Sequence, residues 1–281
     1  MRLNCGPFSL DLTRPLVMGI VNVTPDSFSD GGRHFSASRA IEHGLQLMQE
    51  GAGILDVGGE STRPGAAPVG EQEELDRVLP VIEGLREAGL PISIDTYKPA
   101  VMRAAIAAGA CLVNDVNALL APGALEVVAG TDAGVCLMHK QGDPHNMQSK
   151  PAYTDVVAEV GAFLMERLHA CSAMGIPRDR LVVDPGFGFG KSLEHNLALL
   201  RRLAEFGHLG VPVLAGLSRK SMLGAITGQP VEQRMPASVA AALIAVQRGA
   251  RIVRVHDVRA TCDALAVWQS VENQQQRGDR E

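Results

Sequence analysis

The chain has 281 residues, of which 46% are hydrophobic and 20% are charged, with a formal net charge of −5. This length can bury one large core, and the composition is ordinary for a soluble globular enzyme. The acidic balance and the 4% of aromatic residues argue against a nucleic-acid-binding surface.

The N-terminus, the apolar runs and the cysteines predict a cytoplasmic protein. Met1–Leu12 lacks the basic start and apolar stretch of a signal peptide. No apolar run approaches the ~20 residues that a membrane helix requires. The five cysteines are odd in number, scattered and without C-x-x-C spacing, so we expect reduced and mostly buried thiols.

The first predicted element is a short hairpin over Leu3–Leu12, with its turn at Gly6-Pro7, and we expect it to close one end of the main repeat. From Leu16 onward, short apolar runs alternate with helical patterns and form this repeat. The expected elements are, in chain order, strand Leu16–Val21, helix Ala37–Gln49, strand Ile54–Val57, helix Glu71–Glu87, strand Ile92–Ile94, helix Pro99–Ala108, strand Leu112–Val113, helix Gly123–Ala129, strand Val135–Met138, helix Val156–Met174, strand Leu181–Val183, helix Leu193–Phe206, strand Val213–Leu214, helix Ala237–Arg248, strand Ile252–Val253 and helix Thr261–Val271.

Eight strand-then-helix units without a compositional seam predict one α/β domain, a closed (β/α)8 TIM barrel with an N-terminal β-hairpin. The barrel domain is expected to span residues 1–272, and residues 273–281 to form a polar, disordered tail. An open doubly wound sheet is the alternative. Against it, no G-x-G-x-x-G opens the first helix.

Polar side chains stand at the carboxyl ends of the predicted strands. In a parallel barrel these ends share one mouth, where the loops after the strands build the active site. The polar residues expected at this mouth are Asn22, Asp95, Asn114, Asp184, Lys220, Arg254 and His256. Strand ends in a purely structural barrel would be mostly small or apolar, so this set favours a binding site. Arg251 precedes the last strand, is expected at the opposite end, and receives no role.

The residues at the mouth divide into two chemistries. Asp95, Asn114 and Asp184 offer acceptors and an amide that suit the edge of a neutral heterocycle with N–H donors beside a carbonyl. Arg254 and His256 alternate on one strand and therefore point the same way. The SRKS segment, residues 218–221, is expected to open a helix whose first amides attract anions. Together they predict a ligand with a neutral ring and an anionic group.

Three predicted loops are longer than such connections require. Val23–Ser36 and Glu60–Gly70 are rich in Gly, Pro, Ser and Thr, and we interpret them as lids that order over a substrate. His139–Tyr153 is similarly long, but nothing near His139 or His145 has metal-ligand spacing, so both are expected on the surface.

The segment Gly186–Ser192 is one residue short of the phosphate-binding pattern G-x-x-x-x-G-K-[ST]. Without that residue, the backbone amides of the loop cannot be assumed to form the same phosphate cradle. The segment is therefore only a weak indication of a nucleotide site.

Eight segments stand in the chain in this order: IVNVTPDSFSDGG, DVGGESTRPG, SIDT, LVNDVNAL, LMHKQGDPHNMQ, VVDPGFGFGKS, GLSRKS and RVHDV. Together they resemble bacterial dihydropteroate synthase, from Leu16 to about Val267. TPDSFSDGG combined with GESTRPG is a very specific signal. The resemblance implies a barrel enzyme of folate biosynthesis that joins 6-hydroxymethyl-7,8-dihydropterin diphosphate to p-aminobenzoate and releases pyrophosphate. It also implies Mg²⁺, inhibition by sulfonamides, and a homodimer formed through outer helices.

The resemblance also implies roles for individual residues. It places the pterin against Asp95, Asn114, Met138, Asp184 and Lys220. It places Mg²⁺ on Asn22, and the diphosphate on Thr62, Arg63, Arg254 and His256. It places p-aminobenzoate between Phe28, Pro64, Phe189 and Lys220, with its carboxylate at Ser218. The implied catalytic set is Asn22, Arg63, Asp95, Asp184, Lys220, Arg254 and His256.

Three other interpretations compete with this one. A barrel that passes the methyl group of methyl-tetrahydrofolate to a corrinoid would share the pterin-edge residues, but gives no reason for STRPG, SRKS and RVH together. A Schiff-base aldolase would use Lys220 and leave the acidic residues unexplained. A pterin-binding paralogue without catalysis is disfavoured by the intact lid motif.

No Ser-His-Asp or Cys-His set is visible, so we expect no covalent enzyme intermediate.

Overall fold

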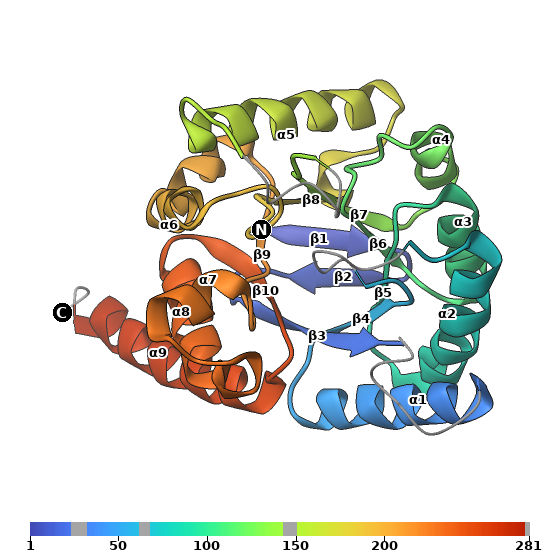
Figure 1. Ribbon diagram of the computed structural model, residues 1–281, viewed down its shortest axis with the longest axis horizontal. Helices are drawn as coiled ribbons and strands as arrows, with labels where there is room; N and C mark the ends of the chain where they lie inside the picture. The colour runs from blue at the N-terminus through green and yellow to red at the C-terminus, as the bar shows by residue number, and fades with distance from the viewer. Residues whose placement is uncertain (24–32, 62–67, 143–150, 279–281) are drawn as a thin grey trace.

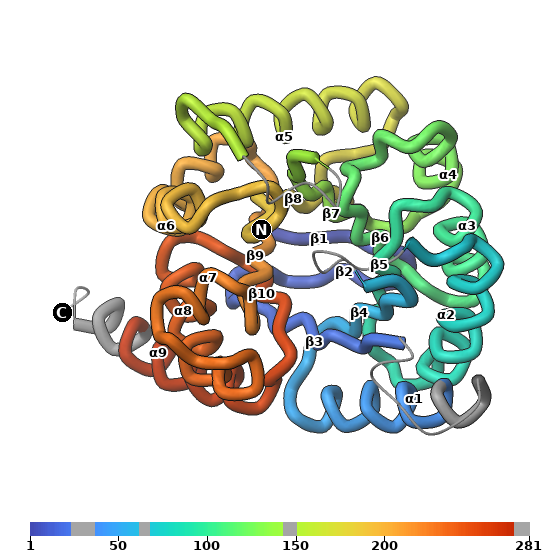
Figure 2. The backbone as a smooth tube through the Cα atoms, in the orientation of Figure 1, coloured from blue at the N-terminus to red at the C-terminus, as the bar shows by residue number. Residues whose placement is uncertain are grey.

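Eight parallel strands form a closed barrel in the computed structural model, which describes residues 1–23, 33–61, 68–142 and 151–278. The barrel strands are β3 Leu16–Asn22, β4 Ile54–Gly58, β5 Ile92–Asp95, β6 Leu112–Asp115, β7 Gly134–Met138, β8 Leu181–Asp184, β9 Val213–Ala215 and β10 Ala250–Val255. Each strand pairs with the next, and β10 returns to pair with β3, which closes the ring (Figure 2). The predicted (β/α)8 barrel is confirmed, and the open sheet is excluded.

The α-helices surround the strands as an outer ring (Figure 1). They are α1 Arg33–Gln49, α2 Glu71–Leu85, α3 Pro99–Ala108, α4 Ala124–Ala129, α5 Val156–Ala173, α6 Leu193–Arg201, α7 Ser221–Thr227, α8 Met235–Gln247 and α9 Val258–Gly278. Short 3₁₀ helices are η2 Arg86–Ala88, η3 Arg178–Arg180, η4 Leu203–Leu209 and η5 Val231–Gln233. Among the described residues, no helix has the length and apolar character needed to cross a membrane.

Several helix ends depend on local chemistry. The carboxylate of Asp155 accepts hydrogen bonds from the first amides of α5, and Ser192 forms a capping box with His195 at the start of α6. Pro99 occupies the first turn of α3, as expected.

Other helix ends differ from the prediction. The helix predicted to reach Phe206 divides into α6 and η4, because Arg202 leaves the helical conformation. The last helix continues to Gly278, beyond its predicted end at Val271. In addition, α1 begins four residues earlier than predicted, which shortens the first long loop.

The N-terminal hairpin closes the amino end of the barrel. Strands β1 Arg2–Cys5 and β2 Phe8–Asp11 pair antiparallel around Gly6, whose φ is +53°. The two strands lie across the middle of the ring in Figure 1. The hairpin is therefore present, and closes the barrel, as predicted. Its apolar side chains pack against the barrel interior at this amino end and form one buried cluster with it. The cluster consists of Leu3, Leu12, Met18, Ile54, Leu112, Cys136, Val182, Leu214 and Ile252.

Above this apolar layer the barrel interior becomes polar. Side chains alternate along a strand, so residues two positions further along face the same interior space. By this alternation the upper layer contains Asp56, Asn114, Asp184 and Arg254, one from each of β4, β6, β8 and β10. The sequence thus builds an apolar floor and a polar layer at the carboxyl mouth, where a functional site is expected.

All five cysteines are free, and four of them are buried, as expected.

Candidate active site

Arg254 links strands that are far apart in the sequence. Its Nε donates a hydrogen bond to Asp56 Oδ2 at 2.5 Å, and its Nη2 donates to Asp95 Oδ2 at 2.6 Å. Asn114 Nδ2 donates to the same Asp56 oxygen at 3.1 Å. Three residues that were predicted at separate strand ends therefore belong to one hydrogen-bonded network.

Asp56 belongs to this network but was not among the predicted site residues. Its side chain is fully buried, and its Oδ1 has no hydrogen-bond partner among the described residues. Its strand register neighbour Ser93 also has a buried hydroxyl without such a partner. A lone carboxylate inside the apolar run of β4 needs a buried cation, because an unpaired buried charge is strongly destabilising. The need of a buried carboxylate for a cationic partner is therefore the signal by which Asp56 could have been found from the sequence.

Asp184, Lys220 and Arg254 surround one small space next to Gly216. A Cβ atom placed on Gly216 would lie 3.8 Å from Asp184 Oδ2, 3.9 Å from Arg254 Cβ and 4.0 Å from Lys220 Nζ. The other oxygen of Asp184 accepts a hydrogen bond from the Gly186 amide at 2.7 Å. A glycine at this position leaves room for about one methyl group among the three predicted residues, which therefore lie close to one another at the mouth.

The loop after β8 brings Phe189 to Lys220, as the resemblance implies for a shared substrate contact. Lys220 Nζ donates a hydrogen bond to the Phe187 carbonyl and lies 4.6 Å from the centre of the Phe189 ring. At this distance the ammonium and the ring attract each other. Met138, at the end of β7, is buried and borders the same loop at Gly186.

Ser218 and His256 are hydrogen-bonded to each other. Ser218 Oγ accepts from the His256 amide at 3.2 Å and lies 3.0 Å from His256 Nδ1. Ser218 precedes α7, whose N-cap is Lys220. The SRKS segment therefore leads into a helix as predicted. The two contacts with Ser218 Oγ fix the orientation of the His256 imidazole.

Asn22 and His256 line a common cavity of about 510 Å³ between the barrel and α1. The lining residues are Ile20, Asn22, Arg39, Glu42, His43, Gln46, Arg219 and His256. The Arg219 guanidinium is directed to Asp257, with bonds of 3.1 Å from Nε and 2.6 Å from Nη2. Arg219 thus has an intramolecular partner, and Asn22 is the lining residue that the resemblance assigns to a metal ion.

Burial shifts the proton affinities of the charged groups at the mouth. It raises the pKa of Asp95 to about 7, against the opposing effect of Arg254, and it raises the pKa of Asp184, against Lys220. Burial lowers the pKa of Lys220 to about 8, with Asp184 acting in the opposite direction. Charged groups whose pKa values move toward neutrality in one cleft are typical of an active site.

His139 is buried, so its prediction as a surface residue is wrong. The residue comes directly after β7, its amide bonds to the Asp184 carbonyl, and its side chain is 7% exposed. Its Nδ1 lies 3.0 Å from Lys191 Nζ, and the Phe163 ring contacts it edge-on. The loop after β8 covers it from above, which a single-sequence pattern does not reveal.

Several predicted residues lie outside the described part of the chain. They are Phe28, Thr62, Arg63, Pro64 and His145. The same holds for most of the two loops interpreted as lids. Within the described residues, no group of three or more His, Cys, Asp or Glu side chains is placed to hold a metal ion.

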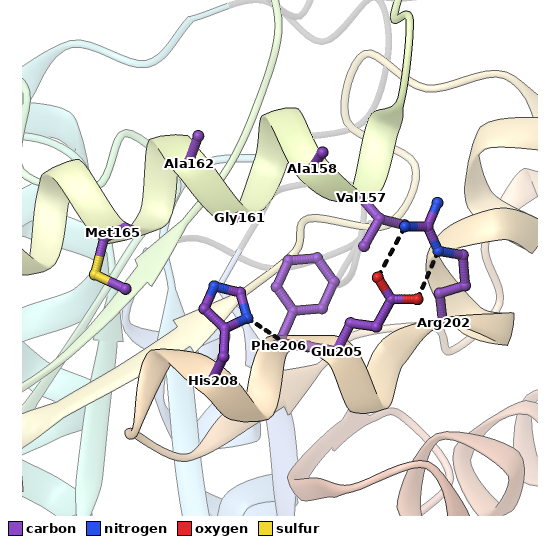
Figure 3. Close-up of a pocket in the computed structure, with 9 residues that line it drawn as sticks. All are labelled: Val157, Ala158, Gly161, Ala162, Met165, Arg202, Glu205, Phe206 and His208. Atoms are coloured by element: carbon purple, nitrogen blue, oxygen red, sulfur yellow. Dashed lines mark hydrogen bonds and ion pairs between the residues drawn. The ribbon is translucent and has the colours of Figure 1, made fainter.

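A second cavity, of about 370 Å³, lies outside the barrel between α5 and η4 (Figure 3). Its lining comes from α5 on one side and from Arg202 and η4 on the other, with the Arg202–Glu205 ion pair at 2.7 Å among the side chains drawn. It contains none of the predicted site residues. The functional site is therefore assigned to the barrel mouth.

Comparison with known proteins identifies the family. A family model described as pterin binding enzyme matches residues 18–256. The dihydropteroate synthase of Haemophilus influenzae is 52% identical over 274 residues, which cover 97% of this chain and 100% of that protein. The chain belongs to the dihydropteroate synthase family.

Solved structures of this family share the fold. A Xanthomonas albilineans dihydropteroate synthase with 4-aminobenzoic acid is 58% identical, with a TM-score of 0.92 and coverage of 96% of this chain and 98% of that chain. A Burkholderia cenocepacia dihydropteroate synthase complexed with 7,8-dihydropteroate is 49% identical, with a TM-score of 0.90 and coverage of 98% of both chains. The resemblance seen in the sequence is confirmed, and the synthase interpretation is favoured over methyl transfer to a corrinoid or Schiff-base chemistry.

Proposed function

We propose that the barrel mouth condenses 6-hydroxymethyl-7,8-dihydropterin diphosphate with p-aminobenzoate to give 7,8-dihydropteroate and pyrophosphate. The observation that carries the proposal is the convergence of Asp184, Lys220 and Arg254 around Gly216, beside the network of Asp95 and Asn114. The 4-aminobenzoic acid and 7,8-dihydropteroate complexes of the related synthases support the choice of substrate and product.

The polar layer supplies the groups that a pterin edge requires. The aminopyrimidinone part of a pterin carries N–H donors beside a carbonyl. Asp95 and Asp184 accept from such donors, Lys220 donates to an acceptor, and Asn114 does either. Hydrogen bonds to charged groups contribute about 1.5–3 kcal/mol each. An analogue without these donors would leave buried carboxylates unpaired and would be rejected.

Cationic groups on the other side of the site take the diphosphate. In this proposal Arg254 and His256 act with Thr62 and Arg63. The pterin C–O bond breaks first, its electron pair leaves with pyrophosphate, and the ring nitrogens spread the positive charge left on carbon. Arg254 is held in advance by Asp56 and Asp95, so it stabilises the growing negative charge without reorganisation.

The donor set fits a magnesium ion bound largely by the substrate. Mg²⁺ commonly takes only one or two protein oxygens and completes its coordination with phosphates and water. Asn22 offers one amide oxygen in the cavity that it shares with His256. A bound Mg²⁺ would add positive charge beside the departing pyrophosphate.

The aromatic amine enters from the side of Phe189. We place its ring against Phe28, Pro64, Phe189 and Lys220, and its carboxylate at Ser218. The neutral amine attacks the cationic carbon, forms the C–N bond, and loses its proton after attack. No covalent bond to the enzyme is required, and closing loops would keep water from capturing the cation.

The division of labour is tested with two variants. Arg254→Ala and Asp184→Ala should both abolish synthase activity. By calorimetry, Arg254→Ala should still bind a pterin without diphosphate, whereas Asp184→Ala should not. Equal pterin affinity in the two variants would refute the assignment. If loss of Arg254 prevents folding through the unpaired Asp56, the double variant Asp56→Asn/Arg254→Gln removes both charges together.

A homodimer through outer helices is part of the proposal. Exposed apolar side chains gather on the last helices: Ile226 on α7, Met235 on α8, and Val267 and Val271 one turn apart on α9. Val267→Glu should then shift the sedimentation coefficient from dimer to monomer, and an unchanged value would contradict this interface. A cytoplasmic location stays a prediction, supported by the five free cysteines.

A further inference from the structure

Lys191 is a buried cation to which the proposed reaction gives no role. It ends the glycine-rich loop 185–190 after β8, and its side chain is 2% exposed. Its Nζ lies 2.9 Å from the Gly186 carbonyl, 3.0 Å from the Phe189 carbonyl and 3.0 Å from His139 Nδ1. The ammonium is therefore turned into its own loop, unlike the lysine of a nucleotide-binding loop, which reaches toward phosphate.

These contacts define the protonation of the buried pair. An ammonium group has three hydrogens to donate, and here two carbonyls and His139 Nδ1 are placed to accept them. Burial lowers the pKa of Lys191 to about 7, so below pH 7 the ammonium is present and His139 is neutral, with its hydrogen on Nε2. Burial and the charge of Lys191 lower the pKa of His139 to about 3, which agrees with a neutral imidazole.

The loop that Lys191 holds lies directly against the backbone after β7. Gly186 and Gly190 have φ values of +70° and +63°. A Cβ on Gly186 would collide with the His139 carbonyl, and one on Gly190 with the Gln141 carbonyl. Tyr153 adds a further tie, because its hydroxyl donates to the Gly190 carbonyl at 2.9 Å. The path of the loop is thus fixed on the side that faces the backbone after β7.

The opposite side of the same loop forms the wall of the proposed p-aminobenzoate subsite. The Phe187 carbonyl accepts from Lys220 Nζ, and the Phe189 ring lies 4.6 Å from that ammonium. A Cβ on Gly188 would lie 3.1 Å from Lys220 Cδ. Lys191 and Lys220 therefore bind different carbonyls of one short segment, and a shift of one changes the surroundings of the other.

We infer that Lys191 is a positioning residue for the p-aminobenzoate subsite, acting through Phe189 and Lys220. The inference rests on the proposed placement of that substrate. Without the ammonium, the carbonyls of Gly186 and Phe189 lose their common donor, and the loop relaxes away from Lys220. The pterin contacts at Asp95 and Asn114 come from other strands and keep their geometry, whereas Asp184 and Lys220 touch the loop, so the loss of pterin affinity should be the smaller one.

The test is Lys191→Met, with Lys140→Met as the matched control outside the loop. Steady-state kinetics should show kcat/KM for p-aminobenzoate lowered about tenfold to a hundredfold in Lys191→Met, with a raised KM, a loss that a displacement of about 1 Å can cause. Calorimetry should show a smaller loss of affinity for the pterin than for p-aminobenzoate, and Lys140→Met should behave as wild type. A lower kcat with both KM values unchanged, or equal rises in both, would overturn the inference.

A second variant covers a failure of Lys191→Met to fold. Tyr153→Phe removes one tie to the same loop and should raise KM for p-aminobenzoate by a smaller factor with unchanged pterin affinity. No such rise would overturn the inference.

The ¹⁵N spectrum of His139, assigned by comparison with His139→Phe, gives a readout independent of activity. The Nε2–H tautomer is expected in wild type at pH 6, where Lys191 is charged, and a mixture at that pH would also overturn the inference. A wild type without synthase activity would instead refute the proposed function.

Discussion

Replacing Gly216 by alanine separates ligand binding from folding. The residue comes directly after β9, is buried, and is not among the glycines with positive φ, so alanine meets no backbone strain. Its new methyl group would lie 3.8–4.0 Å from atoms of Asp184, Arg254 and Lys220, which is ordinary van der Waals contact. The folded protein should therefore accept the substitution, while the methyl group occupies the space proposed for the pterin.

We expect Gly216→Ala to increase the free energy of unfolding and to weaken pterin binding. A glycine-to-alanine change without strain stabilises a protein by about 0.4–1 kcal/mol through the unfolded chain. An extra methyl group in a closely packed site costs about 1–3 kcal/mol. Applied to the complex, this penalty lowers pterin affinity about 5- to 150-fold.

The assay is calorimetric titration with 6-hydroxymethylpterin, combined with thermal unfolding. Gly207→Ala is the matched control, since a Cβ at Gly207 meets nothing within 4 Å and its φ is not positive. We expect weaker pterin binding only in Gly216→Ala, with a Tm equal to or above that of wild type. Unchanged pterin affinity in a well-folded Gly216→Ala variant would refute the location of the pterin.

Four further predictions concern pH, magnesium and stability. Because Asp95 ionises near pH 7 and Lys220 loses its proton near pH 8, kcat/KM should rise toward pH 7 and fall above pH 8, and a flat profile would contradict these roles. The raised pKa of Asp95 also means that its contribution to stability is present below pH about 4 and is lost as pH rises through 7, so Asp95→Asn should flatten that part of a urea-unfolding series. Asn22→Ala should raise the Mg²⁺ concentration needed for half-maximal activity while leaving binding of a pterin without diphosphate unchanged, and equal Mg²⁺ requirements would argue against Asn22 as a ligand. Lys98 forms ion pairs with the buried Glu74 and with Glu60. Lys98→Met should therefore lower the free energy of unfolding, measured in urea, by about 3–5 kcal/mol. A loss below about 1 kcal/mol would show that these ion pairs do not stabilise the fold.

The fold and the strand-end residues were accessible from the sequence because both depend on periodic patterns. Each short apolar run that ends in a polar residue marks a barrel strand, and closure of the ring brings those ends together. Asp95, Asn114, Asp184 and Arg254 were found in this way, and their convergence at one mouth is what the structure shows.

The contacts inside the site were less accessible because they depend on three-dimensional closure. Arg254 and Asp56 are 198 positions apart in the sequence. They become partners only because the closed ring places β10 and β4 on the two sides of β3. Asp56 also stands within a strand rather than at its end. The burial of His139 and Lys191 depends on one loop folding over another, and neither residue stands in a periodic pattern.

The most direct measurement quantifies both products of one reaction. The protein is incubated with 6-hydroxymethyl-7,8-dihydropterin diphosphate, p-aminobenzoate and Mg²⁺, and pyrophosphate and 7,8-dihydropteroate are measured over time. We predict equal amounts of the two products, formed only when p-aminobenzoate is present and abolished in Asp184→Ala. Pyrophosphate released at the same rate without p-aminobenzoate, or full synthase activity in Asp184→Ala, would contradict the proposed reaction.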